Sequence, residues 1–189
     1  MDIEAAIKTR RSVRQFKQDP VSKELLEKVV ESALWAPSYM DWQNWYYVIL
    51  GGDEKDKIYR VLEASFKKVI TSLDDEASED IKKRTRHFLE ATNHAPNLIV
   101  VFSDVNFTET PEALFSVAAS VQNLLLSAHS YGLGACWISS AVYVAEELCE
   151  VLGVLDKELM GVITIGYPLE VPEPTPRKPG RVVWADVDG

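Results

Sequence analysis

The stretch SVQNLLLSAHSYGLGACWI at residues 120–138 decides the fold. It continues a helix that begins at residues 110–112, where Thr, Pro and Glu supply a capping hydroxyl, a proline at the first helical position and an acid in the first turn. This helix runs to Tyr131 and is nearly all apolar in its middle, which is typical of a buried helix. Gly132 is expected to cap its end, and residues 135–138 read as a strand.

The rest of the chain continues this alternation. Apolar residues at helical spacing predict helices, and β-branched or aromatic runs predict strands. The sequence predicts helices at 2–9, with Asp2 as N-cap, between the N-cap Ser22 and Pro37, and at 54–72, 80–93 and 144–152. It predicts strands at 45–50, 98–102 and 160–165, and a polar loop at 74–80. No internal repeat and no linker interrupt this order, so residues 1–189 are expected to form one α+β domain.

The segment 169–189 differs from the rest of the chain. Its four prolines exclude a helix, yet it contains Val182, Val183 and Trp184, which are costly to leave in water. An extended arm that buries these side chains on another surface, such as a partner subunit, would remove that cost.

Composition and charge exclude several classes of protein. Twenty basic residues stand against 29 acidic ones, and the net charge of −9 argues against nucleic-acid binding. No stretch approaches the roughly 20 apolar residues of a membrane span, and the N-terminus lacks an apolar signal core. Cys136 and Cys149 form no CxxC pair, so reduced cysteines in a cytoplasmic protein are expected rather than a disulfide.

Common catalytic motifs are missing. The sequence Gly132-Leu133-Gly134 has Trp137 where a dinucleotide fingerprint needs its third glycine, and it follows a helix instead of a strand. Neither a Walker A sequence nor a GxSxG elbow is present. The spacings of the three histidines match no metal motif, so no metal site is expected.

Two other segments carry more information. Residues 9–16, TRRSVRQF, place three guanidinium groups and a hydroxyl just after a short helix, and arginine forks match phosphate geometry. Residues 36–45 form a polar, aromatic loop between a helix and a strand, where binding loops are common. Together they would suit a planar ligand with a phosphate; alternatively, they are a charged helix end and an ordinary turn with core tryptophans.

Four segments, in this order, give the chain a specific resemblance to the nitroreductase-like flavoproteins. They are RRSVRQF (10–16), APSYMDWQNW (36–45), the 120–138 stretch and GYPLEVPEPTPRKP (166–179). The resemblance implies an α+β fold with a central, mainly antiparallel sheet flanked by helices around a long buried helix. It also implies an intertwined homodimer that holds FMN at the subunit interface, with the C-terminal arm on the partner.

The resemblance assigns residues to three parts of the site. One subunit would contribute the phosphate and ribityl contacts Arg10, Arg11 and Ser12, with Arg14 at the pyrimidine side of the flavin, where a cation favours reduction. The other subunit would line the ring with Pro37, Ser38, Tyr39, Asp41 and Gln43. Backbone amides of Ile138, Ser139 and Ser140 would face flavin N5, and Arg177 and Lys178 would complete the phosphate grip. The candidates for the acceptor pocket are Trp35, Tyr39, Met40 and Trp42, each of which has core packing as its alternative.

The chain departs from the family pattern at three points. Asp41 replaces the loop asparagine, Asn44 replaces the proline after glutamine, and Ser139-Ser140 replaces a glycine pair. An aspartate can accept a hydrogen bond from flavin N3–H, but it would repel O4, so the contact of Asp41 and the redox potential depend on the structure.

The resemblance implies an FMN-dependent oxidoreductase. NADH or NADPH would supply hydride, and a nitroaromatic, quinone or similar electron-poor acceptor would then use the same pocket, which predicts ping-pong kinetics. Two alternatives stay open: specialised flavin chemistry, such as flavin destruction or reductive dehalogenation, and a non-catalytic FMN-binding redox sensor.

Overall fold

The run Leu98–Phe102 shows why the protein has two cores. Its side chains alternate between two buried clusters, with Leu98, Val100 and Phe102 in one, and Ile99 and Val101 in the other. A strand that is covered on both faces needs apolar residues at every position, and all five are fully buried.

The computed structural model describes residues 1–71, 79, 82–83, 95–106 and 109–185. Four strands form one sheet in the order β1-β2-β4-β3, and each neighbouring pair is antiparallel. The strands are β1 (Trp45–Gly51), β2 (Asn97–Ser103), β3 (Gly134–Ile138) and β4 (Glu158–Gly166). The predicted loop at 74–80 and helix at 80–93 lie outside the described residues, apart from 79, 82 and 83.

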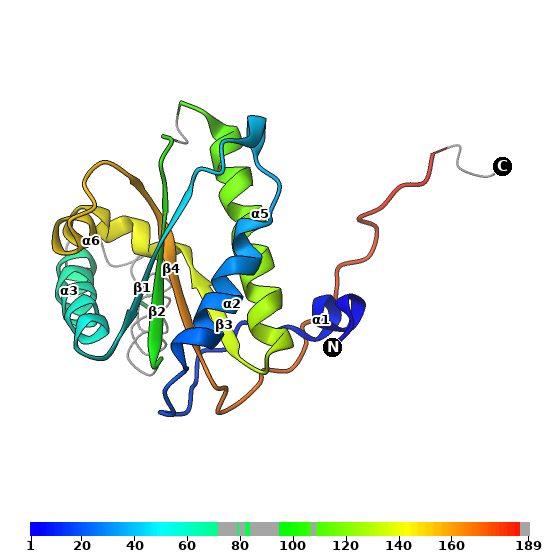
Figure 1. Cartoon of the computed structure of the whole chain (residues 1–189), viewed down its shortest axis with the longest axis horizontal. Helices are drawn as coiled ribbons and strands as arrows, with labels where there is room; N and C mark the ends of the chain where they lie inside the picture. The colour runs from blue at the N-terminus through cyan, green and yellow to red at the C-terminus, as the bar shows by residue number, and fades with distance from the viewer. Residues whose placement is uncertain (72–78, 80–81, 84–94, 107–108, 186–189) are drawn as a thin grey trace.

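Helices cover both faces of the sheet (Figure 1). On one face lie α2 (Lys23–Leu34) and α5 (Pro111–Ser130), and on the other lie α3 (Gly52–Thr71) and α6 (Ala145–Leu152). The predicted α+β fold, with a central antiparallel sheet between helices, is therefore confirmed. No helix in the described residues is both long and apolar enough to cross a membrane.

Three of the four helix caps predicted from the sequence, Asp2, Ser22 and Gly132, are confirmed. Asp2 and Ser22 accept hydrogen bonds from backbone amides three residues ahead, at 2.9 Å and 3.3 Å. Gly132, at φ 79°, follows the last turn of α5 and donates its amide to His129 O. The capping hydroxyl predicted for Thr110 is wrong, because its ψ of 85° departs from the extended geometry of the other two caps and its side chain makes no cap bond.

Helix α5 is less enclosed in one protomer than its sequence predicts. Val117, Val121 and Leu124 are fully buried against the sheet and α2, but Phe115 is 68% exposed on the N-terminal half. An apolar helix with one open side indicates a surface that a partner can cover.

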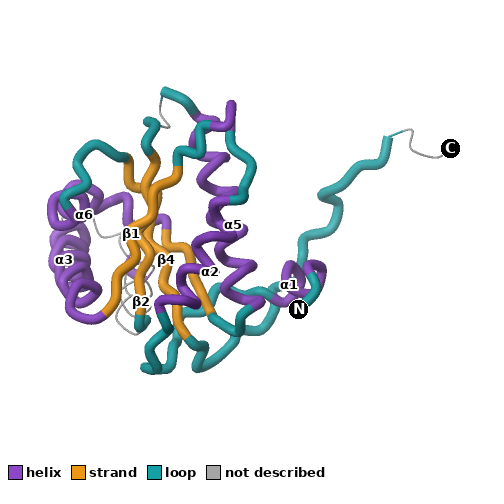
Figure 2. The backbone as a smooth tube through the Cα atoms, in the orientation of Figure 1, coloured by secondary structure: helices purple, strands orange, loops and turns teal. Residues whose placement is uncertain are grey.

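The C-terminal segment is an extended arm, as predicted. Residues 171–185 have no helix or strand, are exposed throughout, and lead away from the body of the protomer (Figures 1 and 2). Val183 and Trp184 are 89% and 80% exposed, so the chain's own core does not cover them. The thiols of Cys136, which is buried, and of Cys149, which is half-buried, are free.

Candidate functional site

The arginine segment, residues 10–16, pairs with β3, which is an edge strand of the sheet. Ser12 forms a parallel bridge with Ala135, and the Val13 amide donates to Ala135 O at 3.1 Å. Gly134 makes this approach possible, because a Cβ added there would lie 2.7 Å from the Val13 side chain. The glycine of the GLG motif thus serves strand packing, and it joins two of the segments that carry the family resemblance.

The three arginines of this segment have no carboxylate partner among the described residues. Arg11 Nη1 donates to Lys8 O at 2.9 Å and to Arg10 O at 2.7 Å, so part of this guanidinium closes α1 (Ile3–Thr9) as a charged helix end. Arg14 donates to Ser12 O at 3.2 Å. Three arginines without a carboxylate partner, in a protein of net charge −9, give this edge of the sheet local positive charge suited to an anion.

The phosphate of FMN fits these residues. Arg11 Nε is buried and has no hydrogen-bond partner within the described part of the chain. A buried donor without a partner is costly, and a phosphate oxygen is an acceptor that would satisfy it. The Arg10 guanidinium makes no hydrogen bond or ion pair to any described residue, which leaves it available to the same anion.

The aromatic loop is held in an uncommon backbone conformation. Met40, Asp41 and Gln43 have φ values of 48°, 57° and 48°, in the left-handed region that non-glycine residues rarely adopt. The Gln43 amide donates to Ser38 Oγ at 3.0 Å, and Gln43 Nε2 donates to Asp41 Oδ1 at 2.9 Å. Asp41 is therefore held by its own loop, and strain of this kind is concentrated at binding sites.

The candidate pocket residues are not core packing of one protomer. Trp35 is 81% exposed and Met40 is 72% exposed. Tyr39 and Trp42 meet edge to face with ring centroids 5.1 Å apart, and both remain partly exposed. Of the tryptophans in this stretch, Trp45 is the one that belongs to the core.

The departure at Asn44 has a structural role. Its side chain is buried, and Nδ2 donates to Ser103 Oγ at 2.9 Å and to Ala113 O at 3.2 Å. Asn44 thus ties the end of the loop to β2 and to the first turn of α5. Its Oδ1 is buried and unpartnered among the described residues, so this amide is not a contact for an exposed ligand.

The predicted amides at 138–140 lie where β3 passes into the 3-10 turn η2 (Ser139–Val144). A β-bulge in β4 supports them: Trp137 Nε1 donates to Met160 O at 3.2 Å, and Gly161 has φ 131°. A Cβ on Gly161 would lie 2.8 Å from Ile138 O. Sequence reasoning missed this supporting glycine, although an isolated glycine inside a strand pattern is a signal for a bulge.

Helix α5 keeps the two halves of the predicted site apart in one chain. At its N-terminal end, Ser116 Oγ accepts the Tyr39 amide at 3.0 Å, and at its C-terminal end His129 contacts Thr9 at 2.8 Å. Thirteen residues of helix separate these contacts by about 20 Å. The arginine segment and the aromatic loop therefore lie at opposite ends of α5 in one chain. Arg177 and Lys178 are exposed on the arm, where Arg177 donates to Thr175 O at 2.8 Å.

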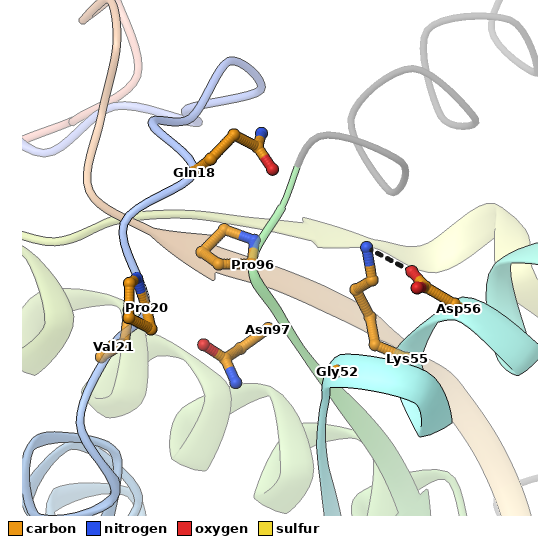
Figure 3. Close-up of a pocket in the computed structure, with 8 residues that line it drawn as sticks. All are labelled: Gln18, Pro20, Val21, Gly52, Lys55, Asp56, Pro96 and Asn97. Atoms are coloured by element: carbon orange, nitrogen blue, oxygen red, sulfur yellow. Dashed lines mark ion pairs between the residues drawn. The ribbon is translucent and has the colours of Figure 1, made fainter.

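A separate pocket of about 260 Å³ lies near the start of α3 (Figure 3). It contains none of the predicted site residues, and its lysine, Lys55, already pairs with Asp56 at 2.8 Å. The residues that line it are Gln18, Pro20, Val21, Gly52, Lys55, Asp56, Pro96 and Asn97.

Comparison with known proteins settles the family. The profile of the nitroreductase family matches residues 7–167, and the chain belongs to this family. It is 28% identical over 179 residues to YfhC of Bacillus subtilis (strain 168), which is named as an NAD(P)H nitroreductase; the match covers 93% of this chain and 89% of YfhC. It is 29% identical to a Methanothermobacter thermautotrophicus protein named as an NADH dehydrogenase/NAD(P)H nitroreductase, over 91% of this chain and 80% of that protein.

Solved structures show the same fold. A BluB-like flavoprotein from Clostridium difficile 630 is 26% identical with a TM-score of 0.80, and 95% of each chain is covered. A nitroreductase-like protein from Bacillus cereus is 27% identical with a TM-score of 0.75, over 95% of this chain and 92% of that one. The recognition of the family from four short segments is therefore confirmed.

Proposed function

We propose that this chain is an FMN-dependent oxidoreductase that takes hydride from NADH or NADPH and reduces electron-poor acceptors such as nitroaromatics or quinones. The unpaired arginines beside Ser12 on the edge of β3 carry the proposal, because they supply an anion site where the family resemblance requires the phosphate. Curated relatives named as NAD(P)H nitroreductases support it.

FMN, when bound, supplies the redox chemistry, by accepting hydride at its ring and passing electrons to an acceptor. The chain's own groups bind and orient it. Arg10 and Arg11 hold the phosphate, and Arg14 places positive charge near the pyrimidine side of the ring, where it stabilises negative charge. Amides at 138–140, supported by the Gly161 bulge, face the reacting edge.

We further infer that the site is shared between two subunits of a cytoplasmic homodimer. The separation of about 20 Å along α5 supports this inference, because the loop of one chain cannot reach its own arginine segment. The exposed side of α5 and the exposed arm give each protomer apolar surface for a partner. Pro37, Ser38, Tyr39 and Gln43 of one subunit then face the cofactor held by the other, with Arg177 and Lys178 adding charge to the phosphate end.

The described residues offer little alternative chemistry of their own. Cys136 lies next to Ala135 in β3, behind the arginine segment, and burial raises the pKa of its thiol. A protonated, buried thiol is a poor nucleophile. No cluster of metal-binding side chains is present in the described part of the chain. These observations favour a cofactor as the source of reactivity.

The visible spectrum of the purified protein, before and after anaerobic addition of NADH and then NADPH, tests the proposal. We expect flavin bands that bleach within seconds with the preferred donor and return when a quinone or nitroaromatic is added. Bands that do not bleach would favour specialised flavin chemistry or a redox sensor. A protein that binds no FMN, even when FMN is added, would contradict the cofactor assignment.

The phosphate assignment has a matched control. Arg10→Ala is expected to lose most of its flavin on gel filtration, while Arg60→Ala, which removes an exposed arginine from α3, keeps it. Equal retention of FMN by the two variants would show that Arg10 does not hold the phosphate.

A further inference from the structure

Helix α1 is a short element with little packing of its own. It has seven residues, only Ala6 among them is buried, and Ile3 and Ile7 are exposed. An isolated helix of two turns is marginal in water, so its position depends on tertiary contacts. It lies beside the C-terminal end of α5, where a polar contact joins the two helices (Figure 1).

The direction of this contact follows from the single proton of a hydroxyl. Thr9 Oγ1 lies 2.7 Å from Ala5 O, to which it donates, and 2.8 Å from His129 Nε2. Since its proton is already used, Thr9 must accept a hydrogen bond from His129 Nε2–H. This bond requires a proton on Nε2 of the imidazole. Burial and the positive charges of Arg10 and Arg11 lower the pKa of His129, which favours the neutral ring.

Thr9, which makes this contact, directly precedes Arg10 and Arg11, the arginines proposed to bind the phosphate. The Arg10 amide donates to Ala6 O, and the Arg11 guanidinium closes the last turn of α1. The turn that contains Thr9 therefore fixes the position of the backbone of both arginines. On the other side, the Val13 amide is fixed to Ala135 O. Arg10 and Arg11 thus lie between two anchors, Thr9, which contacts α5, and Val13, which bonds to β3.

We propose that His129 is a positioning residue for the phosphate end of the FMN site: through Thr9 it anchors α1 to α5 and holds Arg10 and Arg11 in place to receive the phosphate. This inference rests on the proposed FMN binding. It assigns a role to a histidine for which the sequence analysis named no function. It also predicts that loss of the contact weakens binding of the phosphate and leaves binding of the flavin ring unchanged.

FMN and riboflavin differ only in the phosphate, so they are the probes. The dissociation constants of the flavin-free protein for both are measured by flavin fluorescence, with thermal unfolding as a check on folding. His129→Ala and Thr9→Val are each expected to weaken FMN binding about tenfold, near the value of one hydrogen bond, and to leave riboflavin binding unchanged. The double variant should be no weaker than either single one, because both remove the same contact.

Three controls keep the test specific. His129→Gln retains a donor amide and Thr9→Ser retains the hydroxyl, so both should bind FMN nearly as the wild type does. Ser130→Ala removes a neighbouring hydroxyl that donates to Ser127 O and bonds no other described residue, and should have no effect. Two outcomes would overturn the inference without touching the proposed function. One is unchanged FMN binding in His129→Ala and Thr9→Val, and the other is an equal loss of affinity for FMN and riboflavin. A wild type that binds no FMN would overturn the proposed function and the inference with it.

Discussion

At the scale of single residues, the protein relies on polar side chains placed inside apolar packing. Ser116, Ser120 and Ser127 lie along α5, and each bonds a group of α2 or of the aromatic loop. Ser120 donates to Ala33 O at 2.8 Å and so accepts from Tyr47 at 2.6 Å. These serines connect the helix to the elements that carry the candidate site.

Asn44→Asp is expected to destabilise the protein by about 3 kcal/mol or more. The new carboxylate would be buried and would face two acceptors, Ser103 Oγ and Ala113 O, in place of donating to them. Urea denaturation measures the free energy of unfolding, and Gln122→Glu, an equivalent change at an exposed position of α5, serves as control. Equal stabilities of the two variants would contradict the account of Asn44.

Tyr47 predicts a specific loss of stability at alkaline pH. Burial raises the pKa of Tyr47 to about 12, above its ordinary value of 10.0, so its contribution to stability is complete below pH 10 and is lost as the pH rises through about 12. Near pH 8, Tyr47→Phe should cost about 1 kcal/mol through the lost hydrogen bond to Ser120.

The measurement is the difference in unfolding free energy between wild type and Tyr47→Phe, followed from pH 8 to pH 11.5. We expect this difference to shrink as the pH rises above 10. A constant difference for Tyr47→Phe would mean that its hydroxyl titrates normally.

At the scale of elements, the sequence predicts regular structure better than it predicts the loop. The alternation of Leu98–Phe102 and the apolar spacing of α5 specify a strand and a helix, because burial alone requires those patterns. The left-handed backbone of Met40, Asp41 and Gln43 has no such signal, since none of these residues is a glycine. The contact of Thr9 with His129 joins residues 120 positions apart, and no local pattern encodes it.

The strained loop predicts that glycine at position 40 makes the protein more stable than alanine does. Met40→Gly and Met40→Ala both remove an exposed side chain, but only alanine keeps the Cβ that disfavours φ 48°. Met40→Gly is therefore expected to be more stable than Met40→Ala by about 1 kcal/mol. Urea midpoints measure the difference, and an alanine variant as stable as the glycine variant would show that the loop is unstrained.

At the scale of the whole molecule, apolar surface points outward from one protomer. Phe115 on α5 and Val183 and Trp184 on the arm are all exposed, and such surface is uncommon unless a partner covers it. Dimerisation was predicted from the sequence through the burial problem of the arm and through the family resemblance; it stays a prediction.

Replacing Val183 and Trp184 together by serine is expected to raise the dissociation constant of the proposed dimer about 100-fold, since two large apolar side chains would no longer be buried. Light scattering after gel filtration measures this, and far-ultraviolet circular dichroism should be unchanged, because the arm adds nothing to its own protomer's core. Leu155→Ser removes an equally exposed side chain just after α6 and is the control. An unaltered dimer would contradict the role of the arm.

The pairing of the arginine segment also determines when the proposed site can form during synthesis. Besides its bond to β3, this segment pairs with the root of the arm: the Lys17 amide donates to Tyr167 O and the Leu169 amide donates to Gln15 O, both at 2.9 Å. Residues 10–17 are synthesised before β3 and before residues 167–169, the segments that hold them. The phosphate end of the proposed site therefore forms only after residue 169 has left the ribosome, and we expect cofactor loading to follow that step.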